Sequence, residues 1–147
     1  FCLHLGSYQL DEEDYKELDN FAKGDLKTDS LKGTLDKFRH TILRHDEEWQ
    51  VLNPLLANSP YPTLIMGDFN DTPASYIYQK MRKLGFLDAF KEQGKGFGTT
   101  YHGKFPAFRI DYLLHSQDFE CLSYQRPQLD ISDHYPVFAQ FRLIEKD

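Results

Sequence analysis

Three short polar clusters in this sequence combine carboxylates, an amide and a histidine, the side chains that move protons and bind metal ions. The first follows an apolar run and reads Gly67-Asp68-Phe69-Asn70-Asp71. Because successive strand residues point to opposite faces, Asp68 and Asn70 can share one side while Phe69 turns into a core. A carboxylate and an amide held side by side can orient a water and bind a phosphate oxygen or a metal-bound oxygen. Gly, Asp and Asn are also the usual turn residues, so this stretch alone fits a tight turn equally well.

The other two clusters lie farther along the chain and each has an ordinary structural explanation. Arg109-Ile110-Asp111-Tyr112 opens an apolar run, and strand alternation puts Arg109 and Asp111 on one face, as part of a site or as a local ion pair. Ser132-Asp133-His134 directly precedes the last apolar run. A carboxylate beside a histidine at the mouth of a strand suits metal binding and proton transfer. As an isolated dipeptide, Asp-His carries little information.

Together, and in this order, the three clusters resemble the endonuclease/exonuclease/phosphatase superfamily, which includes DNase I, apurinic endonucleases, inositol polyphosphate 5-phosphatases and neutral sphingomyelinases. His4, at the end of the first apolar run, is similar to a histidine of the nuclease and sphingomyelinase branches, although a lone strand histidine also fits a structural role. The resemblance implies half or more of a DNase I-like four-layer α/β sandwich, with a mixed, mostly antiparallel sheet and helices on its outer face. It also implies a phosphoester hydrolase that uses Mg²⁺ or Mn²⁺.

The resemblance implies a role for each polar residue of the first cluster and for Asp133. Asp68 would orient or deprotonate the attacking water. Asn70 would hold a phosphoryl oxygen through its amide N–H, which stabilises the charge that builds in the transition state. Asp133 would be a carboxylate on the metal side, and magnesium needs few such ligands because it keeps several waters.

The remaining site residues implied by the resemblance surround the phosphate. His134 would contact it or transfer a proton, and Asp111 would hydrogen-bond His134 and fix its tautomer. His4 would approach the phosphate from the opposite side. Tyr101 and Arg109 would contact the substrate, with Arg109 alternatively a structural residue paired across its strand face.

The first residues of the chain point to a domain of which only the C-terminal portion is present in residues 1–147. Phe1-Cys2-Leu3-His4-Leu5 reads as the interior of a buried strand. In the resembling family a metal-binding glutamate and an asparagine lie on strands before the position of His4. We therefore expect weak or no activity from this piece alone and activity from its parent. We also expect an exposed sheet face, covered by the missing N-terminal half of the domain or by self-association.

Composition narrows the function classes without choosing a substrate. The net charge is −6, which argues against tight, sequence-independent binding of nucleic acid through a basic surface. Nucleic acid, a phospholipid or a phosphorylated small molecule all remain open as the phosphoester substrate, and a non-catalytic binding domain on the same scaffold is the alternative. Cys2 and Cys121 each lie in an apolar run and are expected to be reduced core residues. The sequence has no signal peptide or membrane-length apolar segment, and its location stays unknown.

Hydrophobic periodicity predicts one α/β unit that would bring these clusters together. Strands are expected over 1–7, 63–69, 108–115, 119–124 and 136–143, with a small strand at 99–101. An amphipathic helix should bury a stripe and end near Asn53 or kink at Pro54. The expected stripe is Leu35, Phe38, Ile42, Trp49, Leu52 and Leu56. A second helix should start at Thr72 as N-cap and end at Gly85. The acidic segment 8–30 is expected as a solvated helical or irregular excursion, which either shapes one wall of the cleft or is decoration.

Overall fold

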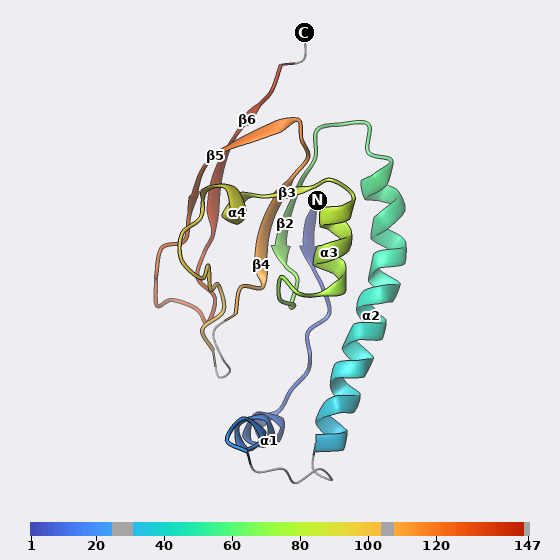
Figure 1. The fold of residues 1–147 in the computed structure, drawn as a ribbon, viewed down its shortest axis with the longest axis vertical. Coiled ribbons are helices and arrows are strands. Elements are labelled where there is room, and N and C mark those ends of the chain that lie inside the picture. Colours follow the sequence, from blue (N-terminus) through green and yellow to red (C-terminus); the bar gives the residue numbers. More distant parts are fainter. Residues whose placement is uncertain (25–30, 104–107, 146–147) are drawn as a thin grey trace.

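A mixed four-stranded sheet is the centre of the fold. The structure, a computed structural model, describes residues 1–24, 31–103 and 108–145 (Figure 1). The strands run in the order β1 (Cys2–His4), β2 (Leu64–Asp68), β4 (Asp111–His115) and β3 (Leu87–Asp88). β1 pairs with β2 in parallel, and the β2–β4 and β3–β4 pairs are antiparallel. The expected mixed, mostly antiparallel sheet is therefore confirmed.

Helices cover one face of this sheet. α2 (Leu31–Ala57) and α3 (Tyr76–Lys83) lie on one side of the strands, and the β5–β6 hairpin (Phe119–Gln125 and Phe138–Leu143) lies on the other (Figure 1). The short helix α4 (Ala89–Gln93) lies near the hairpin, and α1 (Glu12–Ala22) lies against the N-terminal part of α2. The chain thus has the expected α/β architecture with helices on one face of a sheet.

The core lies between the sheet and its two covering helices. Ile65 and Phe69 from the β2 segment and Leu114 from β4 are fully buried, and they pack with Tyr78 of α3 and Trp49 of α2. Alternation along β2 therefore has the predicted result. Phe69 enters the core, and its neighbours Asp68 and Asn70 remain at the sheet edge where a site can form.

The long helix differs from the prediction in which residues it buries and where it ends. Leu35 and Ile42 are exposed at 61% and 55% because the first half of α2 extends beyond the sheet (Figure 1). The helix continues through Pro54 to Ala57. A proline removes only one intrahelical hydrogen bond, and near a helix end that loss is small. The Pro54 carbonyl still accepts a hydrogen bond from the backbone N–H of Asn58.

The acidic run at the start of α1 has a structural role, which corrects the expectation of a merely solvated face. Asp11 caps the helix, and its side chain and that of Asp14 form a reciprocal capping box. Asp14 is buried, and its side chain accepts hydrogen bonds from Thr34 and Lys37 of α2. Part of the predicted excursion, residues 25–30, lies outside the described residues.

Two further expectations are wrong, one about the start of a helix and one about the burial of a cysteine. α3 begins after Ser75, whose hydroxyl accepts the Tyr78 N–H, so the N-cap is Ser75 and not Thr72. Cys2 is exposed, whereas Cys121 is buried as expected, and both are free thiols. Cys2 lies on the first strand of the sheet, on the face away from the helices, where the described residues do not cover it.

Gly67 lets β1 and β2 approach closely at the end where the polar residues lie. Its φ is +138°, a conformation that L side chains rarely adopt, and an added Cβ would lie 1.9 Å from the Leu3 carbonyl oxygen. A larger residue here would push the two strands apart. Glycine therefore fixes the spacing between the strand ends that carry His4 and Asp68.

Among the helices of the described residues, none is both long enough and apolar enough to cross a lipid bilayer.

Candidate active site

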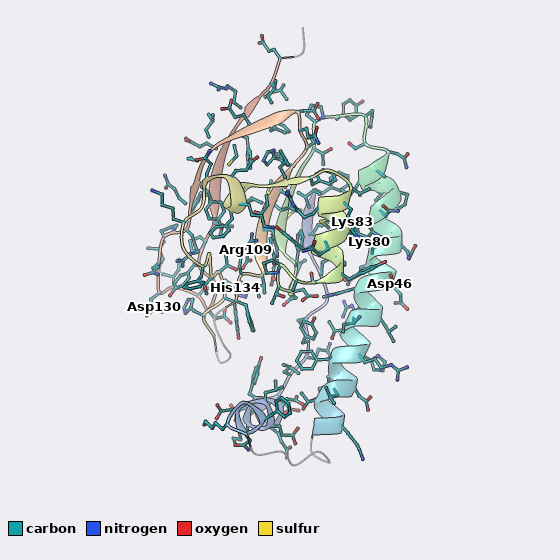
Figure 2. All side chains as sticks on the ribbon, in the orientation of Figure 1. Asp46, Lys80, Lys83, Arg109, Asp130 and His134 are labelled. Atoms are coloured by element: carbon teal, nitrogen blue, oxygen red, sulfur yellow. The ribbon has the colours of Figure 1, made fainter. Side chains whose placement is uncertain are left out.

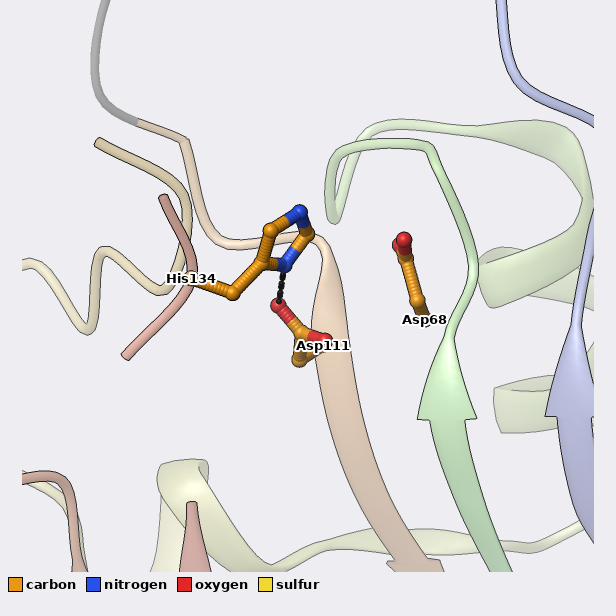
Figure 3. A group of neighbouring side chains, drawn as sticks. All are labelled: Asp68, Asp111 and His134. Carbon is orange, nitrogen blue, oxygen red and sulfur yellow. Dashed lines mark hydrogen bonds and ion pairs between the residues drawn. The ribbon is translucent and has the colours of Figure 1, made fainter. Parts of the chain in front are cut away.

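Asp68, Asp111 and His134 meet at one edge of the sheet, as Figure 3 shows. Asp68 is the last residue of β2 and lies opposite Asp111, the first residue of β4. His134 comes from the segment before β6, and its Nδ1 lies 2.9 Å from Oδ2 of Asp111. The hydrogen bond that sequence analysis expected between Asp111 and His134 is therefore present. It leaves Nε2 as the ring nitrogen that can meet a substrate.

Asn70 turns the chain out of β2 and is held in place from two sides. Its φ is +49°, a left-handed conformation that asparagine tolerates better than most residues. Its backbone N–H donates to Oδ1 of Asp68 at 2.7 Å, and its side-chain amide donates to the Leu5 carbonyl at 2.9 Å. An amide nitrogen carries two hydrogens, so one remains for a phosphoryl oxygen.

His4 and Asp68 face each other across the parallel β1–β2 pair. Nε2 of His4 lies 3.9 Å from Oδ2 of Asp68, and the His4 side chain is largely exposed. Burial raises the pKa of Asp68 and the nearby charge of Asp111 raises it further, against the lowering effect of the Asn70 N–H. The Asp68 carboxylate is thus more basic than an ordinary aspartate.

These residues open onto a cavity of about 560 Å³. His4, Asp68, Asn70 and His134 line it, as does Asp133, whose exposed side chain accepts from Ser132. The other described residues around it are Ser7, Tyr8, Gln9, Leu10, Tyr15, Phe38, Asp71, Thr72, Tyr101, Phe108 and Ile110. Of the two possibilities for the acidic segment, the structure thus favours the first, because its residues form one wall of the cleft.

Tyr101 lies where a residue in contact with substrate would be expected. It forms isolated β-bridges to Phe108 and His134, and its ring meets the His134 ring edge-on with centroids 5.1 Å apart. The backbone N–H of the next residue, His102, donates to the Asp133 carbonyl. The 99–101 segment therefore anchors the loop that carries Asp133 and His134, although only Tyr101 adopts strand pairing. The substrate-binding role of Tyr101 stays a prediction.

Arg109 is a core residue, which corrects its expected place at the substrate and agrees with the alternative of a structural, paired residue. β4 begins only at Asp111, so Arg109 does not share a face with it; its guanidinium instead lies over the Tyr112 ring. It is buried, and its two terminal nitrogens contact the fully buried carboxylate of Asp88 at 3.1 and 2.8 Å. Of the two residues labelled Arg109 and His134 in Figure 2, His134 lines the cavity, whereas Arg109 is not among the described residues that line it.

Replacing Arg109 by Met should lower the free energy of unfolding by about 3–5 kcal/mol, because it leaves the buried Asp88 carboxylate without its cation. Urea denaturation measures the change. Arg142→Met is the matched control, since Arg142 pairs with Glu120 on the exposed hairpin and should lose less than about 1 kcal/mol. Equal losses for the two variants would contradict the assignment of Arg109 to the core.

A second buried cluster, which sequence analysis missed, braces the loop that carries Asn70. His45 of α2 is buried, with Nε2 2.7 Å from the Gly6 carbonyl oxygen and Nδ1 3.3 Å from a carboxylate oxygen of Asp71. Both ring nitrogens face acceptors, so both hold a proton when the two contacts are made. Burial alone would lower the pKa of His45, but Asp71 and the Gly6 carbonyl outweigh it and raise the pKa above its ordinary value. The Tyr8 hydroxyl also bonds Asp71.

Stability should therefore fall as pH rises through the elevated pKa of His45. The stabilisation that protonated His45 contributes is complete below the ordinary pKa of 6.5. It is lost as the pH rises through the elevated pKa of the folded protein, where the imidazolium deprotonates. Urea denaturation between about pH 6 and pH 9 measures this loss. His45→Gln should flatten the pH dependence, and His40→Gln, at an exposed position of the same helix, should leave it unchanged. Identical pH profiles for wild type and His45→Gln would contradict the bracing role.

The donor set at the sheet edge suits a hard divalent cation. Asp68, Asp111 and His134 can each offer one ligand atom, and these atoms lie within 4.8 Å of one another. Carboxylate oxygens are the ligands that Mg²⁺ and Mn²⁺ prefer. Asp133 lines the same cavity without joining this group of three, so its predicted role as the metal ligand stays a prediction.

Comparison with known proteins identifies the class of protein. Residues 13–134 match the Endonuclease/Exonuclease/phosphatase family, which covers most of the chain. The chain therefore belongs to this family, and its fold is part of the DNase I-like α/β fold. No curated protein sequence matches it.

Solved structures agree on the fold. A functionally unknown conserved protein from Enterococcus faecalis V583 aligns with a TM-score of 0.56 and 24% identity over 71% of this chain and 45% of its own. The endonuclease/exonuclease/phosphatase from Bacteroides vulgatus aligns with a TM-score of 0.51 and 22% identity over 74% of this chain and 44% of its own. An endonuclease/exonuclease/phosphatase family protein from Leptotrichia buccalis C-1013-b aligns with a TM-score of 0.51 and 16% identity over 63% of this chain and 41% of its own. The chain thus spans less than half the length of these structures.

Proposed function

We propose that the protein is a phosphoester hydrolase that depends on a divalent metal ion, and that Asp68, Asn70, Asp111 and His134 form its catalytic group. The observation that carries the proposal is the convergence of Asp68 and the hydrogen-bonded Asp111–His134 pair at the mouth of one cavity. Family membership supports the same reaction class. A carboxylate, an amide and an oriented imidazole can supply general-base, electrostatic and general-acid catalysis to the hydrolysis of a phosphoester.

The chain's own residues can move the two protons of the reaction. Oδ1 of Asp68 is occupied by the Asn70 N–H, which leaves Oδ2 to accept a proton from the attacking water. Asp111 holds Nδ1 of His134, so Nε2 can donate a proton to the oxygen of the leaving alcohol. The second amide hydrogen of Asn70 would stabilise negative charge on a phosphoryl oxygen. His4 lies beside Asp68 on the neighbouring strand, lines the same cavity and would contact the phosphate from that side.

A divalent ion would be held from the cavity wall by Asp133, the ligand that the resemblance implies, so that Asp68 and His134 keep their free atoms for proton transfer. When bound, Mg²⁺ or Mn²⁺ would supply Lewis-acid stabilisation of the charge that develops on the phosphoryl oxygens. The ion would offset the negative charge of the phosphoryl group and of the acids that line the cavity.

Hydrolysis of bis(p-nitrophenyl) phosphate and p-nitrophenyl phosphate by the longest natural chain that carries residues 1–147 tests the proposal. Turnover should require Mg²⁺ or Mn²⁺, disappear with EDTA and return when the metal is restored. A folded, metal-loaded protein that cleaves neither compound would overturn it.

A further inference from the structure

The cavity beside the catalytic group has a second part with a different character. Tyr8, Tyr15 and Phe38 line it from the segment after β1, from α1 and from α2, and we refer to these three rings as the aromatic wall. All three are partly buried, and the Tyr8 and Phe38 rings pack with centroids 4.9 Å apart. Aromatic faces exposed inside a cavity favour an apolar surface over water.

The aromatic wall is fixed relative to the catalytic loop. The Tyr8 hydroxyl bonds Asp71, which follows Asn70 directly, and His45 holds both Asp71 and the Gly6 carbonyl. A wall that is already ordered loses little conformational entropy when a ligand binds against it. A group seated on these rings would therefore lie at a set position relative to Asp68 and Asn70.

The charges around the cavity select against additional phosphates. Among the described residues that line it there is no Lys or Arg, whereas Asp68, Asp71 and Asp133 all face it. Among the described residues close to the cavity, Lys37 pairs with Asp11 and Asp14, and Arg44 pairs with Glu48. A metal ion can offset one phosphoryl group, but a second would meet carboxylates with no Lys or Arg among the described residues of the lining. Tight binding of nucleic acids relies on Lys and Arg side chains that neutralise several phosphates, and a polyphosphorylated ring presents the same concentration of charge.

From these features we infer that the site takes an ester with a single phosphoryl group whose organic part is an uncharged ring, seated on the aromatic wall. The inference rests on the proposed function, because it places the phosphoryl group at Asp68 and Asn70. It names the substrate class that the catalytic residues alone leave open. Aromatic and saturated rings share the chemistry that the wall recognises, a flat or compact apolar face.

Binding of non-hydrolysable phosphonates tests the ring preference without turnover. In the longest natural chain that carries residues 1–147, with Mg²⁺ present, phosphorus NMR titration should give a Kd for phenylphosphonate at least about tenfold below that for methylphosphonate, because the ring buries apolar area. Cyclohexylphosphonate distinguishes the two kinds of ring: binding equal to phenylphosphonate indicates simple apolar burial, and weaker binding indicates stacking on the aromatic wall. Equal affinities for phenylphosphonate and methylphosphonate would overturn the inference.

A matched pair of variants locates the ring. Phe38→Ala should reduce the preference for phenylphosphonate to within about threefold, because it removes part of the aromatic wall. Phe21→Ala changes an exposed ring of α1 that is not among the described residues lining the cavity, and it should leave the preference intact. If Phe38→Ala does not fold, the wild-type comparison of the two phosphonates still decides the matter.

Competition and turnover separate this inference from the proposed function. Inositol hexakisphosphate and a short single-stranded DNA should displace phenylphosphonate poorly, and displacement by either at lower concentration than phenylphosphonate itself would overturn the substrate class. A protein that prefers the ring but cleaves no ester would contradict the proposed function alone. A protein that cleaves esters without ring preference would contradict only the inference about the aromatic wall.

Discussion

Asp68→Asn should lower kcat by about 10²–10⁴-fold, the usual contribution of a general base, and leave the protein folded. The amide can still accept the Asn70 N–H at the position of Oδ1, so the loop after β2 keeps its contact. It cannot accept a proton from the attacking water. Because burial penalises the charged form of Asp68, its replacement by a neutral amide should not reduce thermal stability.

Steady-state hydrolysis at saturating Mg²⁺ and thermal unfolding of the same samples measure both effects. Asp46→Asn is the matched control, since Asp46 lies on the exposed side of α2, away from the cavity (Figure 2). It should change neither quantity. An unchanged kcat in Asp68→Asn would remove Asp68 from the mechanism, and a large loss of stability would show that the carboxylate is primarily structural.

His134→Gln and Asp111→Asn should each lower kcat by about 10²–10³-fold, and the double variant should fall only a few-fold further. The two residues act as one unit in proton transfer, because Asp111 holds Nδ1 of His134 through the 2.9 Å contact. Residues that act as a unit give grossly non-additive effects on kcat.

The wild type, the two single variants and the double variant should be compared by kcat, KM and the pH dependence of kcat. If Asp111 orients His134, Asp111→Asn should change the pH profile of kcat, and His134→Gln should remove the corresponding limb. Additive losses in kcat would mean that Asp111 and His134 contribute separately, and would contradict the role of Asp111 as a positioning residue.

The sequence predicted where several candidate residues lie, and it predicted the elements that hold them less well. Strand alternation is enough to turn Asp68 and Asn70 away from the core, whereas their meeting with Asp133 and His134 was implied only by the family resemblance. All four line the cavity. Period-two alternation succeeds here because β2 is flanked by strands and buried on one face by helices, so its register is strongly specified.

Predictions failed where tertiary packing overrides local pattern. Arg109 lies before the regular part of β4, where alternation no longer applies, and the buried Asp88 determines its direction. Leu35 and Ile42 fit a helical stripe, but no sheet lies beneath that half of α2. His45 occupies a polar position in an ordinary helical pattern, and only the fold shows that it reaches the loop after Asn70.

The exposure of Cys2 has a practical consequence. The two sulfhydryls of the chain differ in accessibility, because Cys2 is open to solvent and Cys121 is enclosed, with burial raising its pKa. A maleimide dye or spin label should therefore attach at Cys2 alone. That position lies two residues before His4 on the same face of β1, so an attached probe would report ligand arrival at the sheet edge without any engineered substitution.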